Sequence, residues 1–253
     1  NETEILSLMA AAFIGFCATL SRYDGGFLVL FEALVLFALY FPRKIPFKRL
    51  IGRMVFFVTL AFFGILIWMI WDYLILGDPF YFTNSQFSAR TQQEAWYTRG
   101  ELPSYHNIFL SIGYYLVTGM SNAGVLVFVL AAVGFIKYLF QGNDRTHFYT
   151  ALIMMVPFIF YIITLYIGQS VIFIPHITPV SFEWRLFNVR YGLMVLPAVA
   201  LFLGYLFSRV KTKARLVILF IFLLQFGLYL TGYSKIISLE DGTHGLSAAK
   251  KVD

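Results

Sequence analysis

The stretch from Glu183 to Pro197 holds the residues best suited to chemistry in this chain. Glu183, Arg185 and Arg190 stand just before and at the start of a long apolar run. An arginine at the edge of a bilayer either reaches toward the lipid headgroups or binds an anion. A guanidinium group binds phosphate through two parallel hydrogen bonds and has no proton to lose. We therefore expect Arg190 to help bind a lipid phosphate.

Two further segments place charges at what we expect to be the same membrane face. Arg22 and Asp24 stand in a turn too short to leave the interface, and a longer loop carries charges between Arg90 and Glu101. Partly desolvated charges need partners. The charges therefore have three interpretations: solvated loops, structural pairs (Arg22 with Asp24, Arg190 with Glu183), or the lining of a binding site.

Acidic residues inside the apolar segments have their own alternatives. Glu32 follows Asp24 by about two helical turns on the same face. Its carboxyl group is either protonated or hydrogen-bonded inside the bundle, or it belongs to a proton relay or lines a polar site. Asp72 stands one turn before the end of its segment, where we expect it to reach the interface or cap the helix. We expect Asp78 to support a Gly-Asp-Pro turn.

The composition indicates an integral membrane protein. The chain is 60% hydrophobic and only 13% charged, and its mean hydropathy of +0.77 excludes a soluble globular domain. The lone cysteine, Cys17, lies in an apolar run and predicts neither a disulfide nor a metal site. The net charge of +6 does not indicate nucleic-acid binding, because the basic residues concentrate in short turns between apolar runs.

The apolar runs predict an all-α fold, a polytopic transmembrane helix bundle of about seven spans. The predicted spans are 5–20, 27–41, 55–76, 125–140, 148–167, 190–207 and 216–230. We expect a shorter run, Ile108 to Val117, to form an interfacial or re-entrant helix, because the residues from Thr118 to Gly124 should break or kink it. Gly77 and Pro79 should end the third span.

The distribution of Lys and Arg predicts the orientation in the membrane. More than half of the 19 basic residues lie in the turns 42–53, 137–147 and 208–215, which are cytoplasmic by the positive-inside rule. The loops 78–106 and 168–189 are then extracytoplasmic. We expect one transmembrane domain, residues 1–232, followed by an extracytoplasmic tail or the start of a further segment, residues 233–253. Because the chain starts at Asn1, we also expect helices of a longer protein before it.

Three motifs in this order resemble those of one enzyme family. They are Ala-Thr-Leu-Ser-Arg-Tyr-Asp-Gly-Gly-Phe-Leu from Ala18, Gly-Asp-Pro-Phe-Tyr-Phe from Gly77, and Val-Arg-Tyr-Gly-Leu-Met-Val-Leu-Pro from Val189. The chain resembles GT-C membrane glycosyltransferases, near the family-39 enzymes (protein mannosyltransferase-like) and the aminoarabinose transferases. The resemblance covers most of residues 5 to 207. It implies transfer of a sugar from a polyprenyl-phosphate carrier on the extracytoplasmic side of the cell envelope.

The resemblance also implies roles for single residues. Arg190 would contact the phosphate of the carrier, and Tyr191 would line the same pocket. Arg22, Tyr23 and Asp24 would stand at the rim, with Arg22 as a second contact to phosphate or sugar. Glu183 and Arg185 would belong to the loop that closes over the substrates.

The chain departs from the family at the catalytic base. The family's acidic residue lies in the first extracytoplasmic loop, and no equivalent pair is present here, so the base should precede Asn1 or the chain should be inactive or one part of an assembly. Asp24 is the fallback candidate. We expect no metal and no cofactor, since a fixed arginine can neutralise the leaving phosphate.

Two alternatives to a glycosyltransferase stay open. The first is a transporter or flippase subunit, in which Glu32, Asp72 and Arg190 line a path. The second is a non-catalytic, lipid-binding membrane subunit. The expected partners are a polyprenyl-phosphate lipid, the membrane, and an acceptor glycan, lipid or protein. We expect a multi-pass protein of a prokaryotic inner or plasma membrane, and the sequence leaves the oligomeric state open.

Overall fold

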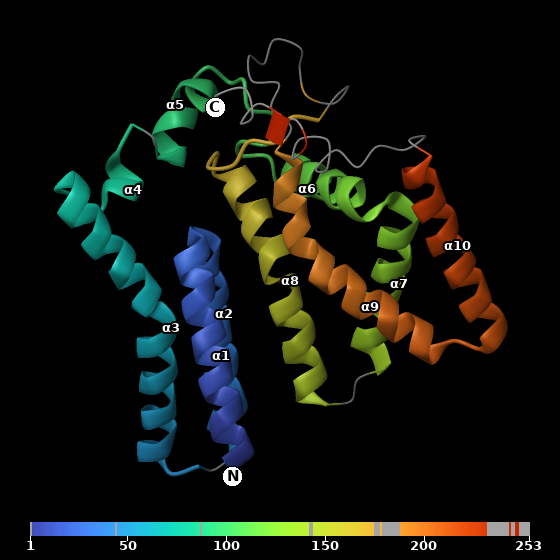
Figure 1. Ribbon diagram of the computed structural model, residues 1–253, viewed down its shortest axis with the longest axis horizontal. Coiled ribbons are helices and arrows are strands. Elements are labelled where there is room, and N and C mark those ends of the chain that lie inside the picture. The colour runs from blue at the N-terminus through green and yellow to red at the C-terminus, as the bar shows by residue number, and fades with distance from the viewer. Residues whose placement is uncertain are drawn as a thin grey trace. The chain divides into compact units, whose positions relative to one another are not determined.

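The predicted all-α fold is confirmed by a computed structural model, in which the described residues form helices, turns and irregular segments but no strand (Figure 1). The described residues are 2–43, 45–86, 88–141, 144–174, 178, 188–231, 243 and 246–247. The chain divides into two compact units. The first comprises Asn1–Thr98 and Asp144–Phe160, and the second comprises Arg99–Asn143 and Tyr161–Asp253. Helix α8 (Arg145–Tyr166) contributes to both.

The first unit is built on three mutually packed helices. These are α1 (Glu2–Ser21), α2 (Tyr23–Tyr40) and α3 (Phe47–Leu76). Short helices follow at η1 (Phe41–Arg43), α4 (Tyr81–Asn84) and α5 (Ala89–Thr98).

Small residues bring α1 and α3 close together in this unit. A Cβ added to Gly15 would lie 3.1 Å from the Cβ of Ala61, and one added to Gly64 would collide with the Thr19 hydroxyl. The same hydroxyl donates to the carbonyl of Ala61 (2.9 Å). Because lipid tails are as apolar as the side chains, close packing and interhelical hydrogen bonds of this kind hold membrane helices together.

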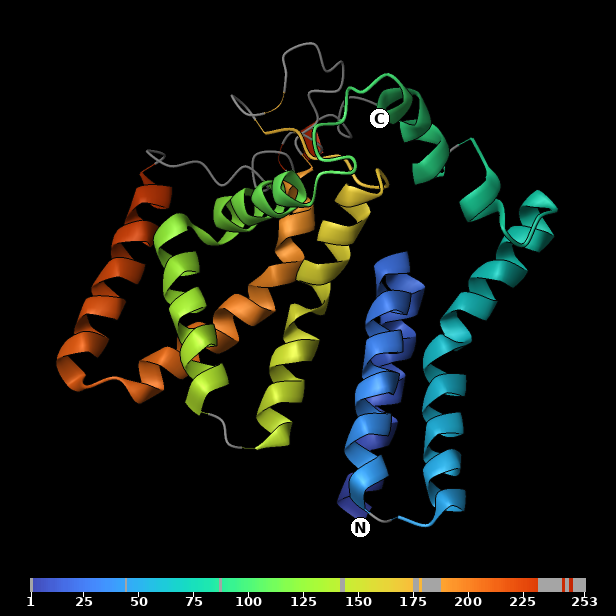
Figure 2. The ribbon, with the colours of Figure 1, turned by 180° about the vertical axis from the view of Figure 1, so that it is seen from behind.

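The second unit contains α6 (Ile108–Ala123), α7 (Val125–Gln141), η2 (Val189–Val195), α9 (Leu196–Arg209) and α10 (Thr212–Leu230). Helix α6 turns into α7 through a bend of 112° at Gly124, which is visible in Figure 2. Helices α7 and α9 pack closely, since a Cβ on Gly134 would overlap the backbone carbonyl of Phe202. The Phe202 ring also makes edge contacts with Phe135 and Tyr138.

Five helices of the described residues are long and apolar enough to cross a membrane, and six if the bent pair α6–α7 counts as one span. The protein is thus a polytopic membrane protein, with fewer candidate spans than the seven expected. Helix α2, with 18 residues, is not among the five. A helix of that length rises about 27 Å, close to the hydrocarbon core of about 30 Å, so length alone does not exclude α2 as a span. The bent pair fits either a broken span or the predicted re-entrant helix.

Candidate functional site

Arg22 and Asp24 form an ion pair at one end of the first unit. The Arg22 Nε atom lies 3.1 and 3.2 Å from the two carboxylate oxygens of Asp24. The Arg22 side chain is 34% exposed and that of Asp24 12%. Asp24 also stands in the first turn of α2, where a negative charge is favoured by the helix dipole. This geometry matches the structural pair that the sequence left open.

The turn between α1 and α2 is tightly built. A Cβ on Gly25 would overlap the backbone carbonyl of Ala18, so only glycine allows this close approach. The indole of Trp68 on α3 donates to the carbonyl of Leu20 (3.0 Å) and ties the end of α1 to α3. Arg22 and Asp24 are therefore carried by a fixed turn.

Asp72 lies one helical turn beyond Trp68 on α3. It is only 6% exposed, and among the described residues its Oδ2 atom has no hydrogen-bond partner. The expectation that Asp72 reaches the interface or caps the helix is wrong. Gly77 caps α3 instead, with φ of 76° and its N–H donating to the carbonyl of Tyr73. The turn role of Asp78 is confirmed, since its carboxylate accepts from the Phe80 N–H (2.8 Å).

Arg190 lies in the second unit on the 3-10 helix η2, and its side chain is exposed. Its guanidinium carbon is 5.8 Å from the centroid of the Tyr191 ring. Asn188, just before η2, donates to the carbonyl of Val171 (3.0 Å), and its own carbonyl accepts from the Tyr191 N–H. The backbone around Arg190 is thus anchored while its charged group faces outward.

Three stacked tyrosines support Arg190 from within the unit. Tyr191 stacks on Tyr161 with ring centroids 5.0 Å apart, and Tyr161 stacks on Tyr115 at 5.2 Å. Tyr115 and Tyr161 are fully buried, and the Tyr115 hydroxyl donates to the carbonyl of Tyr191 (3.0 Å). This stack joins α6, α8 and η2, and its Tyr191 ring is the one beside the Arg190 guanidinium group.

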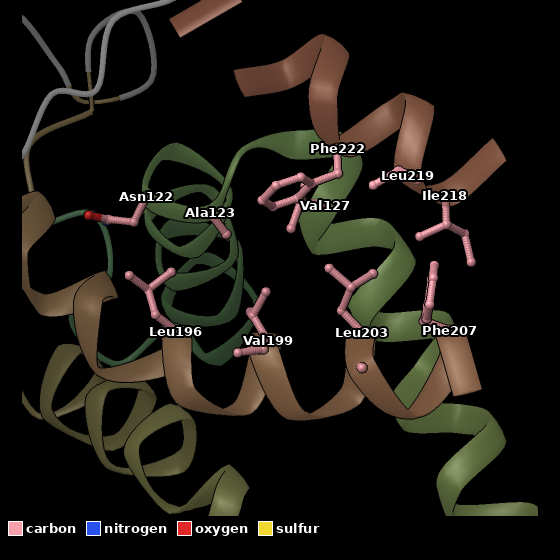
Figure 3. Close-up of a pocket in the computed structure, with 12 residues that line it drawn as sticks. Asn122, Ala123, Val127, Leu196, Val199, Leu203, Phe207, Ile218, Leu219 and Phe222 are labelled. Carbon is pink, nitrogen blue, oxygen red and sulfur yellow. The ribbon is translucent and has the colours of Figure 1, made fainter. Parts of the chain in front are cut away.

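A cavity of about 540 Å³ opens in the same unit, among α6, α7, α9 and α10 (Figure 3). Its lining is apolar except for Asn122: Asn122, Ala123, Val127, Leu196, Val199, Ala200, Leu203, Gly204, Phe207, Ile218, Leu219 and Phe222. The volume falls in the range of small-molecule sites, about 300–1,000 Å³. An apolar cavity between helices of membrane-spanning length suits a hydrocarbon chain.

Arg190 and the cavity are linked through Gly192. A Cβ on Gly192 would lie 2.5 Å from the Asn122 amide nitrogen and 2.7 Å from the carbonyl of Thr118. Gly192 therefore packs directly on the cavity residue Asn122, only two residues after Arg190. Arg190, an exposed cation, is therefore two residues along the chain from a contact with the lining of an apolar cavity.

The remaining predicted site residues are placed as follows. Tyr23 begins α2, but its side chain lies outside the described part of the chain, as do Glu183 and Arg185. Arg22 and Asp24 belong to the first unit, and Arg190 and Tyr191 to the second. Within the described ranges no group of three or more His, Cys, Asp or Glu residues could hold a metal ion.

Sequence reasoning missed the cavity and the tyrosine stack. Both depend on helices far apart in the chain, and an apolar lining looks like any other membrane-facing surface. One signal was available: Gln225 is an uncharged polar residue in the middle of an apolar run. In the structure it lies close to the cavity, against the α6–α7 bend.

Comparison of the chain with protein-family models, with curated proteins and with solved structures gives no match. The resemblance to GT-C glycosyltransferases stays a prediction drawn from the three motifs.

Proposed function

We propose that this chain is part of a membrane glycosyltransferase of the GT-C type. It takes a sugar from a polyprenyl-phosphate carrier and transfers it to an acceptor. Transfer takes place on the extracytoplasmic face of a prokaryotic inner or plasma membrane, the face on which the positive-inside rule places the loops 78–106 and 168–189. The motifs around Arg22, Asp78 and Arg190 suggest this reaction, and the geometry of the second unit is compatible with its donor.

One observation carries the proposal: an exposed, well-supported cation stands two residues before Gly192, which packs on the cavity residue Asn122. Arg190 is fixed through Tyr191 and Asn188, and Gly192 packs on Asn122 at the cavity. A ligand that satisfies both features has an anionic headgroup and a hydrocarbon tail. A polyprenyl phosphate has both.

The chemistry needs such a cation. When the sugar leaves the carrier, negative charge develops on the phosphate, and a fixed guanidinium group stabilises that charge with two parallel hydrogen bonds. The acceptor hydroxyl must lose a proton to a carboxylate within hydrogen-bond reach. Arg190 serves the first requirement in this proposal.

A non-catalytic lipid-binding subunit is the second candidate. Both carboxylate oxygens of Asp24, the fallback base, lie within hydrogen-bond distance of Arg22 Nε. These contacts are those of a structural ion pair, the alternative that the sequence left open for Arg22 and Asp24. This observation favours a chain that binds the carrier while another segment or subunit supplies the base.

The first test replaces Arg190 with alanine in the full chain purified in detergent. Binding of farnesyl phosphate should weaken about tenfold to a hundredfold, since a hydrogen bond to a charged group contributes about 1.5–3 kcal/mol. Arg190→Lys should recover only part of this loss, because lysine keeps the charge without the paired hydrogen bonds. Release of sugar from polyprenyl-phosphate-linked mannose, measured in parallel, separates the enzyme from the lipid-binding subunit.

Arg209 provides a matched control. It is exposed at the other end of α9, and its guanidinium carbon lies 5.4 Å from the centroid of the Tyr205 ring. Arg209→Ala should leave farnesyl phosphate binding unchanged. Equal losses for the two arginines would indicate a general charge effect and contradict the assigned role of Arg190.

A further inference from the structure

The bend between α6 and α7 leaves backbone groups without helical partners. Gly124 has φ of 83°, a conformation that residues with a Cβ rarely adopt, and the two helices meet there at 112°. The last carbonyls of α6 and the first N–H groups of α7 lack intrahelical partners. Where such groups are buried, another part of the protein must pair with them.

Gln225 supplies a partner on each side of the bend. Its Nε2 atom donates to the carbonyl of Ala123 (2.7 Å), and its Oε1 atom accepts from the N–H of Val127 (3.3 Å). Its Nε2 atom also lies 3.4 Å from the hydroxyl of Tyr229. Gln225 is only 7% exposed although it lies on α10, where most side chains are exposed. One amide thus joins α10 to the ends of both other helices.

The same contacts form one end of the cavity. Ala123 and Val127, which bind Gln225, line the cavity from α6 and α7. Phe222, one turn before Gln225, lines it from α10, and Figure 3 shows its ring pointing toward Val127. The position of the α10 wall therefore depends on the Gln225 amide.

We infer that Gln225 is a positioning residue for a hydrocarbon-chain site in this cavity. Its amide holds α10 at a fixed distance from the α6–α7 bend, and this keeps the cavity wide enough for one prenyl chain. The inference rests on the proposed function, since it takes the tail of the same carrier phosphate as the occupant. Asn122 supports this choice: it is the polar group of the lining, and it packs on Gly192 close to Arg190.

The test measures how affinity depends on chain length. Geranyl, farnesyl and geranylgeranyl phosphate carry the same headgroup, so their affinities for the full chain in detergent differ only through the tail. In the wild type, affinity should rise with each added prenyl unit. In Gln225→Leu, this rise should disappear, and geranylgeranyl phosphate should bind about tenfold more weakly. The reason is that, without the amide contacts, a smaller fraction of the molecules has α10 in the position that leaves room for the tail. Affinity for geranyl phosphate should stay within about twofold of the wild type.

Two control variants separate positioning from general stability. Thr164→Val removes another buried hydrogen bond of the same unit, from Ser170 (2.9 Å), and Thr164 does not line the cavity. It should lower the melting temperature while the chain-length dependence persists. Gln225→Met keeps the length of the side chain and loses both hydrogen bonds. It should behave like Gln225→Leu, and it replaces that variant if the leucine form does not fold.

The outcomes distinguish the two proposals. If the wild type binds longer prenyl phosphates better and both Gln225 variants retain that preference, the positioning role is overturned while the proposed function stands. If the wild type binds none of the three phosphates, the proposed function is overturned and the occupant of the cavity with it.

Discussion

Two aspartates near the end of α3 differ in what their carboxylates meet. Asp78 accepts a hydrogen bond from the Phe80 N–H, whereas the Oδ2 atom of buried Asp72 has no hydrogen-bond partner among the described residues. A buried polar atom without a partner costs about 1–3 kcal/mol. Local turn geometry therefore explains Asp78, whereas no hydrogen bond of the described residues explains the buried Oδ2 atom of Asp72.

Asp72→Leu should raise the free energy of unfolding by about 1–3 kcal/mol, because an apolar side chain removes the cost of the unpaired oxygen. The melting temperature of the purified chain in detergent measures this gain. Asp78→Leu is the control and should lower the melting temperature, since the Phe80 N–H loses its acceptor. A lower melting temperature for Asp72→Leu would show that the Asp72 carboxylate has a stabilising partner.

Single residues also show how much the sequence could predict. The Gly-Asp-Pro motif predicts the end of α3 correctly, because the hydrogen-bond partners of Gly77 and Asp78 lie only a few residues away in the chain. Arg190 was expected at the start of the last but one apolar span, and the candidate span Arg190–Arg209 does begin there, with its first turns in the 3-10 helix η2. Helix α9 begins only at Leu196, with Pro197 in its first turn, where the missing N–H of proline is tolerated.

At the scale of elements, α6 is longer than the sequence predicts. The residues from Thr118 to Gly124 were expected to break or kink the helix, and the bend of 112° at Gly124 confirms the kink. The helix does not end at Thr118, however, because the side chains of Thr118, Ser121 and Asn122 hydrogen-bond to carbonyls of their own helix. These bonds satisfy the polar groups without leaving the helix, so α6 continues to Ala123. The sharp bend at Gly124 depends on Gln225, about a hundred residues away in the chain, and local sequence gives no information on that contact.

The bend itself predicts a strong effect of Gly124→Ala. The positive φ strains any residue with a Cβ, and that Cβ would collide with the Gln225 amide. We expect the free energy of unfolding to fall by about 1–3 kcal/mol. Gly113→Ala in the same helix is the control: a Cβ there meets nothing within 4 Å, and alanine should stabilise α6 by about 0.5–1 kcal/mol. Similar melting temperatures for the two variants would contradict the strain at Gly124.

At the scale of the whole molecule, the helical class and the membrane location follow from composition and apolar run length alone. The number of spans does not, because α2 is not among the five candidate helices and the bent pair has two interpretations. Sequence order brought Arg22 and Arg190 into one hypothesis, whereas the structure assigns them to separate compact units. Within each unit the contacts described for these arginines are local in the chain: Arg22 pairs with Asp24, and Arg190 lies over Tyr191.

The predicted orientation can be tested with introduced cysteines in a Cys17→Ala background. Lys48, Lys213 and Gln86 are exposed positions in two predicted cytoplasmic turns and one predicted extracytoplasmic loop. In intact cells a membrane-impermeant maleimide should label Gln86→Cys, and it should label Lys48→Cys and Lys213→Cys only after the membrane is opened. The Cys17→Ala parent should stay unlabelled. Labelling of Lys48→Cys and Lys213→Cys from opposite sides would contradict the topology.

The distance along the chain between Gln225 and its partners also bears on biosynthesis. The ribosome makes Ala123 and Val127 about a hundred residues before the glutamine that satisfies them. Until α10 is made, the carbonyl of Ala123 and the N–H of Val127 lack the partner that they have in the folded unit. Nascent α6 and α7 therefore settle into their final bent arrangement late, when the last helix of the unit arrives.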